Sequence, residues 1–390
     1  MYLSAMSRYL LVLTLLLSVG ACADSALRTG AEQPGRYLPL LEGGKVGLVV
    51  NQTSRVGERH LIDFLRERDL DIERIFALEH GIRGDVENGG RVDDGVDGPS
   101  GLPIVSLYGG NHKPSREEVR DLDWLLFDIQ DVGVRFYTYI SSLHYLMQAC
   151  ADYQVPLLVL DRPNPNGDYV DGPVLEKEYR SFIGMHPIPL VHGLTVGELA
   201  RMINGEGWLE GDARCDLTVI PVAGYRKQMR YSLPVEPSPN LPNDRAIRLY
   251  PSLGLFEGTV VSIGRGTEYP FQVIGHPDDR RGRYSFEPVS MPGASENPKY
   301  RGHRLRGDDL RGGDPDERFT LRYLIDWRGR TGESGEAFFS RAEFFDKLAG
   351  TDALRLAVLA GKSEAEIRRG WQPALQRYLQ RRRPYLLYPE

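Results

Sequence analysis

The chain has 390 residues, of which 41% are hydrophobic and 26% are charged, and these proportions are ordinary for a soluble globular protein. A chain of this length can form two domains, each with its own hydrophobic core. The formal net charge of −6 argues against nucleic acid as the main partner, because phosphate binding needs a basic surface.

The N-terminal segment has the form of an export signal. Arg8 precedes an apolar run at residues 9–19, which is too short to span a bilayer comfortably, and small residues follow. The order Val-Gly-Ala before Cys22 resembles a bacterial lipobox, in which the cysteine becomes the lipidated first residue of the mature chain. The alternative is an ordinary cleavable signal with an incidental cysteine. Both interpretations predict an exported protein of the cell envelope.

We therefore expect residues 1–22 to be a signal segment and residues 23–40 to be a tether. Acylation of Cys22 would be the only contact with a membrane. The other two cysteines, Cys150 and Cys215, can pair in an oxidising compartment.

Apolar strand-like runs alternate with helical patterns from residue 45 onward. The predicted strands are short and rich in Val, Leu and Ile, and they cover residues 45–50, 72–78, 103–107, 124–127, 156–160 and 217–222. Apolar positions at helical spacing lie between them, at residues 61–65, 116–120, 140–151 and 195–203. Continuous apolar strands separated by helices indicate a parallel sheet that is covered on both faces. The sequence therefore predicts an α/β fold with a Rossmann-like sheet.

Polar residues follow four of the predicted strands, namely Asn51, Glu79, Asp128 and Asp161. Ligands of open parallel sheets bind outside the carboxyl ends of the strands. A single polar residue there is an ordinary strand terminator, but four at four strand ends favour a shared site. Residues 51–57 lack the Gly-x-Gly-x-x-Gly of a dinucleotide fold, and no phosphate-binding P-loop occurs. The expected ligand is thus not a nucleotide.

Metal chemistry and serine catalysis lack their usual sequence signals. No His-x-x-x-His or Cys-x-x-Cys pair occurs, and no Gly-x-Ser-x-Gly elbow is present. A metal site can still assemble from side chains that are distant in sequence, namely Glu79, His80, Asp128 and His192. Carboxylates beside arginines, tyrosines and asparagines predominate instead, and this composition suits glycoside chemistry without a cofactor.

Two loops after predicted strands carry side chains that suit sugar binding. Residues 128–139 place four of them in one strand-to-helix connection, namely Asp131, Arg135, Tyr137 and Tyr139. Residues 161–167 cannot be helical, because the prolines at 163 and 165 hold the residues before them extended. A stiff loop would therefore present Asn164 and Asn166 to sugar hydroxyls, although asparagines also form turns.

Two further patterns are interpreted as structural. Thr195-Val-Gly-Glu198 is a capping box, which assigns Glu198 to the start of a helix rather than to a site. Near the C-terminus, Ile367, Trp371 and Leu375 share one helical face and are expected in the core. Pro373 is expected to kink or break that helix.

A series of motifs occurs in order along the chain: "LEHGIRG", "DIQDVGVRFYTY", "DRPNPNG", "VHGLTVGELA", "EPSPNLPN", "FEGTVVSIGRGTEYPF" and "EIRRGWQPALQRYLQRRRPYLLYP". From about Gly43 to Pro389, the chain resembles the NamZ-type exo-β-N-acetylmuramidases of bacterial cell-wall recycling. One departure is visible, because the family usually reads Glu-Gly-Thr-Asn where this chain has Val260 in the place of the asparagine.

The resemblance implies a Rossmann-like catalytic domain at residues 41–245, a smaller α+β auxiliary domain at residues 246–390, and a cleft between them. It also implies release of terminal N-acetylmuramic acid from the non-reducing end of peptidoglycan fragments, so muramyl saccharides are the expected partners. Glu257 and Arg265 would enter the cleft from the second domain. The other candidates for substrate binding are Asn51, Arg83, Arg135, Tyr137, Arg162, Asn164, Asn166, Glu176, His192 and Asn240.

Cleavage of a glycosidic bond needs one carboxylic acid to protonate the leaving oxygen and a second carboxylate to activate water or attack the sugar. Glu79 is the predicted acid, because the end of a buried strand favours the protonated form. His80 would orient Glu79 or bind substrate. Asp128 and Asp131 are the leading candidates for the second group, with Glu176 and Glu257 after them. Inversion, retention and assistance by the substrate's own acetamido group all stay open.

N-acetylmuramic acid carries a lactyl carboxylate that N-acetylglucosamine lacks, and an arginine matches a carboxylate with two parallel hydrogen bonds. We expect at least one of Arg83, Arg135 and Arg265 to bind it, while Arg162 would pair with Asp161 instead. Two other functions stay open. One is a non-catalytic peptidoglycan-binding lipoprotein, and the other is a metal-dependent amidase or deacetylase of the cell wall.

Overall fold

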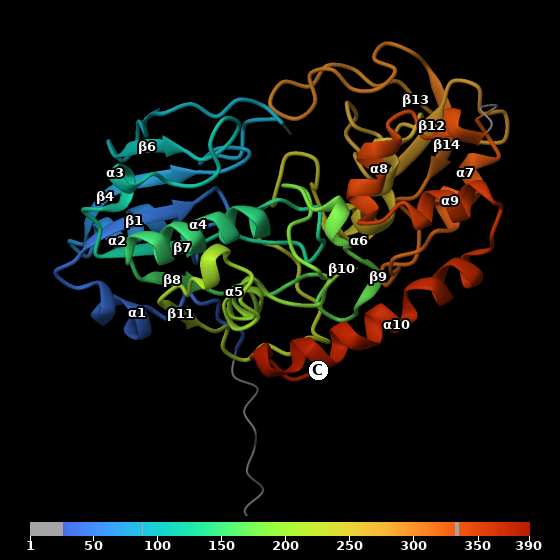
Figure 1. The fold of residues 1–390 in the computed structure, drawn as a ribbon. Helices are drawn as coiled ribbons and strands as arrows, with labels where there is room; N and C mark the ends of the chain where they lie inside the picture. Colours follow the sequence, from blue (N-terminus) through green and yellow to red (C-terminus); the bar gives the residue numbers. More distant parts are fainter. Residues whose placement is uncertain (1–25, 88, 332–334) are drawn as a thin grey trace, which may run out of the picture.

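The computed structural model describes residues 26–87, 89–331 and 335–390, and Figure 1 shows its two halves side by side. The N-terminal half (residues 26–245) contains a large sheet, and the C-terminal half (residues 246–390) contains a smaller sheet and several helices. The predicted signal segment and Cys22 lie outside the described residues. Within the described ranges, every helix is too short or too polar to span a bilayer.

The large sheet has seven strands in the order β11-β8-β7-β1-β4-β6-β5. Every neighbouring pair is parallel except β5 and β6. The strands are β1 (Lys45–Val50), β4 (Asp71–Ala77), β5 (Gly95–Val96), β6 (Pro103–Ser106), β7 (Trp124–Asp128), β8 (Leu157–Leu160) and β11 (Leu217–Ile220). The predicted α/β fold is confirmed. Strand β5 is not among the predicted strands, because two residues are too few to show a strand pattern.

Helices cover both faces of this sheet. They are α1 (Pro34–Leu41), α2 (Leu61–Arg66), α3 (Arg116–Val119), α4 (Tyr139–Tyr153) and α5 (Val196–Gly205). Val49 and Phe76 share a core with α4 and α5, whereas Leu48 and Val50 share one with α1 and α2. Successive side chains of a strand point to opposite faces, so the unbroken apolar run of β1 supplies both cores.

The central strand β1 lies between β4 and β7. The chain runs outward from β1 through β4 and β6, and then returns to the other side of β1 to form β7, β8 and β11. A reversal of this kind separates the loops that follow neighbouring strands and opens a crevice at their carboxyl ends. The loops after β4, β6 and β7 all contribute to the cavity described below.

Residues 26–40 are folded onto the sheet, so the prediction of a tether over this stretch is wrong. Helix α1 buries Tyr37 and Leu41 against the sheet. Before it, the Gly30 amide donates to the Asp161 carbonyl at 2.8 Å, and an added side chain at Gly30 would collide with backbone atoms there. The composition of helix α1 is misleading, because a proline inside a segment, here Pro39, is more typical of a linker than of a helix.

Two short antiparallel ribbons lie outside the large sheet. They are β2 (Arg55–Val56) with β3 (Arg59–His60), and β9 (Asp171–Val174) with β10 (Pro189–Val191). Strand β9 also packs against the last helix of the chain, so the second ribbon joins the two halves.

The C-terminal half has an antiparallel sheet in the order β12-β14-β13, with helices beside it. The strands are β12 (Val273–His276), β13 (Tyr284–Phe286) and β14 (Leu305–Asp309). The helices are α6 (Asp244–Leu253), α7 (Arg322–Arg328), α8 (Ala342–Ala349), α9 (Ala353–Leu359) and α10 (Glu364–Arg382), and a 3-10 turn, η3 (Gly254–Gly258), follows α6 directly.

Helix α10 continues through Pro373, so of the two predicted outcomes, a kink or a break, the break does not occur. Ile367, Trp371 and Leu375 are buried on one face, as predicted, and Tyr378 extends that face by one turn. A proline removes one backbone hydrogen bond, and this packing on both sides of it holds the helix together.

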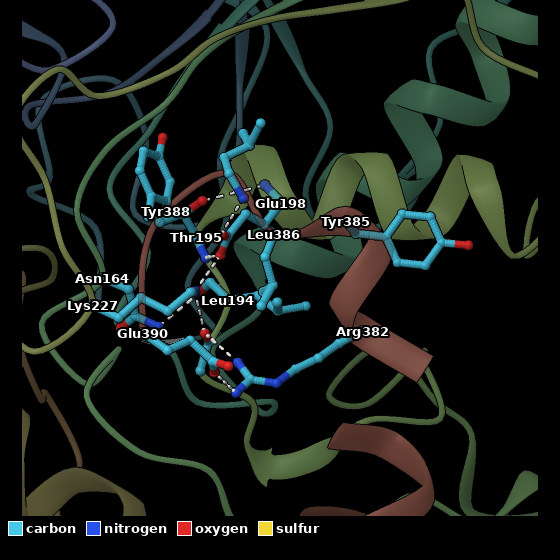
Figure 2. A network of polar contacts seen from close by, with 12 residues as sticks. Asn164, Leu194, Thr195, Glu198, Lys227, Arg382, Tyr385, Leu386, Tyr388 and Glu390 are labelled. Atoms are coloured by element: carbon cyan, nitrogen blue, oxygen red, sulfur yellow. Dashed lines mark hydrogen bonds and ion pairs between the residues drawn. The ribbon is translucent and has the colours of Figure 1, made fainter. Parts of the chain in front are cut away.

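After α10 the chain folds back onto the N-terminal half (Figure 2). The hydroxyl of Tyr388 donates to the Asp161 carboxylate and accepts the Val222 N–H at 2.9 Å. Glu198 has the predicted capping-box geometry. It also forms a buried ion pair with Lys227 at 2.5 Å and accepts the Leu387 N–H at 2.8 Å. The last residues therefore pack against the N-terminal half, where Tyr388 forms a small cluster with Val222 and Tyr225.

Cys150 and Cys215 are buried free thiols, so the pairing that the sequence leaves open is not formed. The neighbouring Cys215 thiol and burial raise the pKa of Cys150 well above its usual value.

Candidate active site

A cavity of about 280 Å³ lies between the two halves, at the carboxyl ends of the strands. The N-terminal half contributes Glu79 and His80 after β4, Tyr108 after β6, and residues 136–139 after β7. The C-terminal half contributes Tyr250, Glu257, Arg265, Arg341 and Phe344 among others. The cavity is therefore built where the sheet topology predicts a crevice, and both halves are needed to close it.

Glu79 is the carboxylate that the N-terminal half places in this cavity. Its side chain is 5% exposed and is held by three hydrogen bonds. One carboxylate oxygen accepts the Tyr108 hydroxyl at 2.8 Å and the Gly89 N–H at 3.3 Å, and the other accepts the Thr138 hydroxyl. These donors come from the loops after β4, β6 and β7, so the sheet fixes the carboxylate from three sides.

His80 sits beside Glu79 with its backbone in the left-handed region, at φ 68°. Its Nδ1 donates to the Val86 carbonyl at 2.7 Å, because a carbonyl oxygen can only accept. Burial lowers the pKa of His80, and the nearby Glu79 charge opposes this only in part. The ring is therefore neutral near pH 7, and its Nε2 is free to accept a hydrogen bond.

Tyr139 connects Glu79 to the central strand. Its hydroxyl donates to the Glu79 backbone carbonyl at 3.1 Å and accepts the Asn51 side-chain amide at 3.0 Å. Asn51, at the end of β1, also accepts both the N–H and the hydroxyl of Thr53 through its side-chain oxygen. Asn51 thus acts as a positioning residue behind the cavity and does not line it.

Glu257 is the carboxylate that the C-terminal half contributes. It lies on η3, and its side chain accepts the Arg265 Nε–H at 2.6 Å. Burial alone would raise the pKa of Glu257, but the charges of Arg265 and Lys299 hold it below its usual value. Glu257 is therefore ionised at neutral pH.

Lys299 explains how η3 is held in place. Its ammonium group donates to the carbonyls of Phe256, Glu257, Thr259 and Val261, at 3.0, 3.3, 2.6 and 3.4 Å. Burial lowers the pKa of Lys299 to about 8, although the Glu257 charge opposes the shift. The motif around Glu257 gives no hint of this support, because the lysine lies some forty residues further along the chain.

Comparison with known proteins supports the same architecture. Residues 46–245 match the family model described as exo-beta-N-acetylmuramidase NamZ, N-terminal, and residues 248–388 match its C-terminal counterpart. The chain belongs to the NamZ family. It is 37% identical to the peptidoglycan beta-N-acetylmuramidase NamZ of Bacillus subtilis (strain 168) over 373 residues, which are 90% of this chain and 89% of that protein.

Two solved structures from Bacteroides fragilis NCTC 9343, both described as DUF1343 family proteins, share the fold. One is 46% identical with a TM-score of 0.87, covering 94% of this chain and all of that one. The other is 28% identical with a TM-score of 0.79, covering 93% of this chain and 99% of that one. The two-half architecture therefore recurs among NamZ relatives.

Asp128 and Arg162 are not in the cavity of this NamZ chain, contrary to the prediction. They form a buried bidentate ion pair, with Arg162 Nε and a terminal nitrogen at 2.6 and 2.8 Å from the Asp128 oxygens. The expected pairing of Arg162 with Asp161 is likewise wrong. Asp161 instead caps α5, where it accepts the Gly197 N–H at 2.8 Å and the Thr195 hydroxyl at 2.7 Å.

Asp131 and His192 face each other below the cavity and do not line it. Asp131 Oδ2 accepts the Gly133 N–H at 2.6 Å and lies 3.8 Å from His192 Nε2. Within the described ranges, Asp131 Oδ1 and His192 Nε2 are buried without a hydrogen-bond partner. Burial raises the pKa of Asp131 to about 7 and lowers that of His192 to about 3. Both are therefore removed from the predicted site.

Arg135 is fully buried, and no carboxylate among the described residues pairs with it. Its terminal nitrogens donate to the carbonyls of Pro173, Ile188 and Leu348, at 2.8 to 2.9 Å. Burial lowers the pKa of Arg135 to about 9. The prediction that it binds substrate is contradicted, because its position within the core fastens the C-terminal half to the ribbon of the N-terminal half.

Asn164 and Asn166 hold loops together, as the alternative interpretation proposed. Asn164 donates to the Leu194 carbonyl at 2.8 Å, and Asn166 donates to the Val132 carbonyl at 2.9 Å. Arg83 forms two bonds with Asp97 and Glu176 accepts the Thr351 hydroxyl, both outside the cavity. These four residues are therefore not substrate contacts in this structure.

The predicted residues that the structure does bring together in the cavity are Glu79, His80, Tyr137, Asn240, Glu257 and Arg265. Sequence reasoning missed Tyr108, Thr138 and Arg341, which lie outside the parts of the motifs that carry a recognisable chemical pattern. Val260, the visible departure from the family, does not line the cavity. Its carbonyl accepts the Tyr300 hydroxyl at 2.7 Å, and its side chain packs against the core.

Proposed function

We propose that this protein releases terminal N-acetylmuramic acid from the non-reducing end of peptidoglycan fragments by hydrolysis. Membership of the NamZ family supports a glycoside hydrolase of peptidoglycan. Within the molecule, one observation carries the proposal. Glu79 from the N-terminal half and Glu257 from the C-terminal half line the same cavity. Two carboxylates around a saccharide-sized cavity are the groups that glycoside hydrolysis requires.

Glu79 is assigned the role of the general acid that protonates the leaving oxygen. It is held by donors from three loops, so its carboxyl group is positioned before substrate enters. Glu257 takes the place of Asp128 and Asp131 as the second carboxylate, because Arg265 keeps it ionised, as a base or nucleophile must be. His80 Nε2 is assigned to accept a hydrogen bond from a sugar hydroxyl.

The cellular location remains part of the proposal. The export signal and the lipobox-like Cys22 support a protein held at the cell envelope by an acylated N-terminus, close to peptidoglycan. One acyl chain anchors a protein only marginally, so multiple acylation is expected.

A defined muramyl-glucosamine disaccharide separates this proposal from its alternatives. Incubation with the purified protein should yield free N-acetylmuramic acid and N-acetylglucosamine, and exhaustive chelation should leave the rate unchanged. Binding without cleavage would favour a non-catalytic peptidoglycan-binding lipoprotein. Release of acetate or of a peptide, lost on chelation and restored by zinc, would favour the metal-dependent deacetylase or amidase. Among the described residues, no group of three His, Cys, Asp or Glu side chains is arranged to hold a metal ion.

A further inference from the structure

We propose that Arg341 binds the lactyl carboxylate of the substrate, and that it, rather than Arg265, sets the preference for N-acetylmuramic acid. The inference rests on the proposed function and names the residue that recognises the charged part of the sugar. Three observations carry it, namely the commitments of the other arginines, the place of Arg341 in the cavity wall, and the charge balance there.

The arginines expected to bind this carboxylate are engaged elsewhere. Arg83 is paired with Asp97, and Arg135 is enclosed by backbone carbonyls in the core. Arg265 lines the cavity, but its Nε–H is donated to Glu257 at 2.6 Å, and the pair is neutral as a whole. A carboxylate that bound Arg265 would compete with Glu257 for one charge.

Arg341 lies immediately before α8 and forms part of the cavity wall. It also borders a second, shallower hollow of about 460 Å³, lined by Ala342, Glu343, Phe344 and Lys347 as well. In the part of the chain that the structure describes, Arg341 is exposed and forms no ion pair. Its guanidinium carbon lies 4.0 Å from the centre of the Phe344 ring. Stacking fixes the plane of the guanidinium and leaves its N–H edges for a ligand.

The spacing along α8 matches the shape of a lactyl ether. Arg341, Phe344 and Leu348 all line the cavity, and residues three and four apart lie on one face of a helix. This face offers an apolar strip that ends in a cation. The methyl group and sugar ring of the substrate can contact Phe344 while the carboxylate reaches Arg341.

The charge balance of the cavity leaves one cation for an anionic ligand. Its charged residues are Glu79, Glu257, Arg265 and Arg341. Glu257 is paired with Arg265, and Glu79 carries a proton when it acts as the acid, so Arg341 is left to meet the charge of the sugar. Lys347 adds positive charge over the hollow, and Glu343 offsets part of it.

A side-chain substitution at Arg341 should leave the fold intact. The contact between α8 and η3 is made by the Arg341 backbone N–H, which donates to the Gly258 carbonyl at 3.0 Å. A methionine would keep this bond and most of the packing against Phe344. Arg377, an exposed arginine of α10 outside the cavity, provides the matched control.

The test compares three β-glycosides with the same nitrophenol leaving group, made from N-acetylmuramic acid, its neutral lactyl methylamide, and N-acetylglucosamine. Arg341→Met should lower kcat/KM for the acid by about 10- to 150-fold, as expected for a charge-assisted bond, and change the two neutral substrates by less than about 3-fold. Arg341→Lys should recover part of the loss. Arg377→Met should match the wild type.

Two kinetic results would overturn the inference. One is an equal loss on all three substrates in Arg341→Met, which indicates a structural role. The other is a loss confined to the acid in Arg265→Met and absent in Arg341→Met. Calorimetric binding of free N-acetylmuramic acid and free N-acetylglucosamine separates this inference from the proposed function. If the wild type hydrolyses none of the glycosides, the function is wrong. A binding preference for the free acid that Arg341→Met abolishes would still support the carboxylate site, and an unchanged preference would overturn it.

Discussion

Asp131 differs from the other acidic residues near the sheet, because its carboxylate is buried without a full set of hydrogen-bond partners. It is 4% exposed, one of its oxygens has no partner, and burial raises its pKa to about 7 despite hydrogen bonds from Gly133 and Val132. An acid with a raised folded pKa holds its proton in the folded state while the unfolded chain has already lost it. Ionisation of Asp131 therefore does not reduce the free energy of unfolding below about pH 4, and it reduces that free energy progressively as the pH rises to about 7.

Replacing Asp131 by asparagine should remove this pH dependence. At pH 8 the variant should gain on the order of 4 kcal/mol relative to the wild type, and the gain should vanish near pH 4. Urea unfolding of both proteins across this range measures it. The buried histidines have lowered pKa values and opposite slopes, but they are common to both proteins and cancel in the difference. Parallel stability curves would show that Asp131 is ionised throughout.

Among the structural elements, the loop after β4 links the Glu79 carboxylate to the C-terminal half. It carries the Gly89 N–H that Glu79 accepts, and Glu87 in the same loop accepts the Glu296 N–H at 2.7 Å. Gly293 approaches it closely with φ at 74°, and an added Cβ would lie 2.7 Å from the Asp85 carbonyl. If Gly293 is pushed away from this loop, the position of the Glu79 carboxylate should therefore change as well.

Gly293→Ala should lower kcat by about 10-fold or more, because a small misplacement of a reacting group is costly, and should affect global unfolding much less. Glu296→Ala is the matched control, since it keeps the backbone N–H that Glu87 accepts, and it should behave as the wild type. Steady-state kinetics and thermal unfolding of both variants provide the comparison. Normal turnover in Gly293→Ala would mean that this contact does not position the loop.

Sequence patterns predict the strands more accurately than the roles of the residues that follow them. The six parallel strands are predicted to within a few residues, because burial on both faces gives each of them a continuous apolar run. The polar residues after the strands are found equally well, but their roles are not. Glu79 turns into the cavity, while Asp128 meets Arg162 and Asp161 caps α5. A strand end does not reveal which partner the tertiary fold will bring to it.

Across the whole molecule, the two halves share one cavity, and the end of the chain returns to the N-terminal half. Arg341 could not be assigned from sequence because Glu257, which shares the cavity wall with it, lies far earlier in the chain. The return of the C-terminus was missed for the same reason. Asp161 and Val222 are far from Tyr388 along the chain, yet both are bonded to its hydroxyl.

Tyr388→Phe should lower the free energy of unfolding by about 1–3 kcal/mol, because the buried Val222 N–H and the Asp161 carboxylate each lose a partner. Urea denaturation measures the change. Activity at a temperature where the variant is folded should be retained, since Tyr388 does not line the cavity. Tyr385→Phe serves as the comparison, because its hydroxyl donates to the partly exposed Glu206, and a smaller loss is expected. Equal losses would show that burial of the Tyr388 bond is unimportant.

The anchoring of the molecule is tested at its N-terminus. Mass analysis of the mature protein from the cell envelope should find acyl chains on Cys22, and Cys22→Ala should appear in the soluble fraction instead. A free amine at residue 22 or 23 without added acyl mass would leave secretion without a lipid anchor.

Glu79 is proposed to act as the acid in release of a terminal N-acetylmuramic acid. The most direct measurement is the rate of sugar release from the muramyl-glucosamine disaccharide by the wild type and by Glu79→Gln, with thermal unfolding of both. The wild type should release free N-acetylmuramic acid, and the variant should lose about 10² to 10⁴-fold of this rate while unfolding at a similar temperature. Near-normal release by a folded Glu79→Gln variant would contradict it.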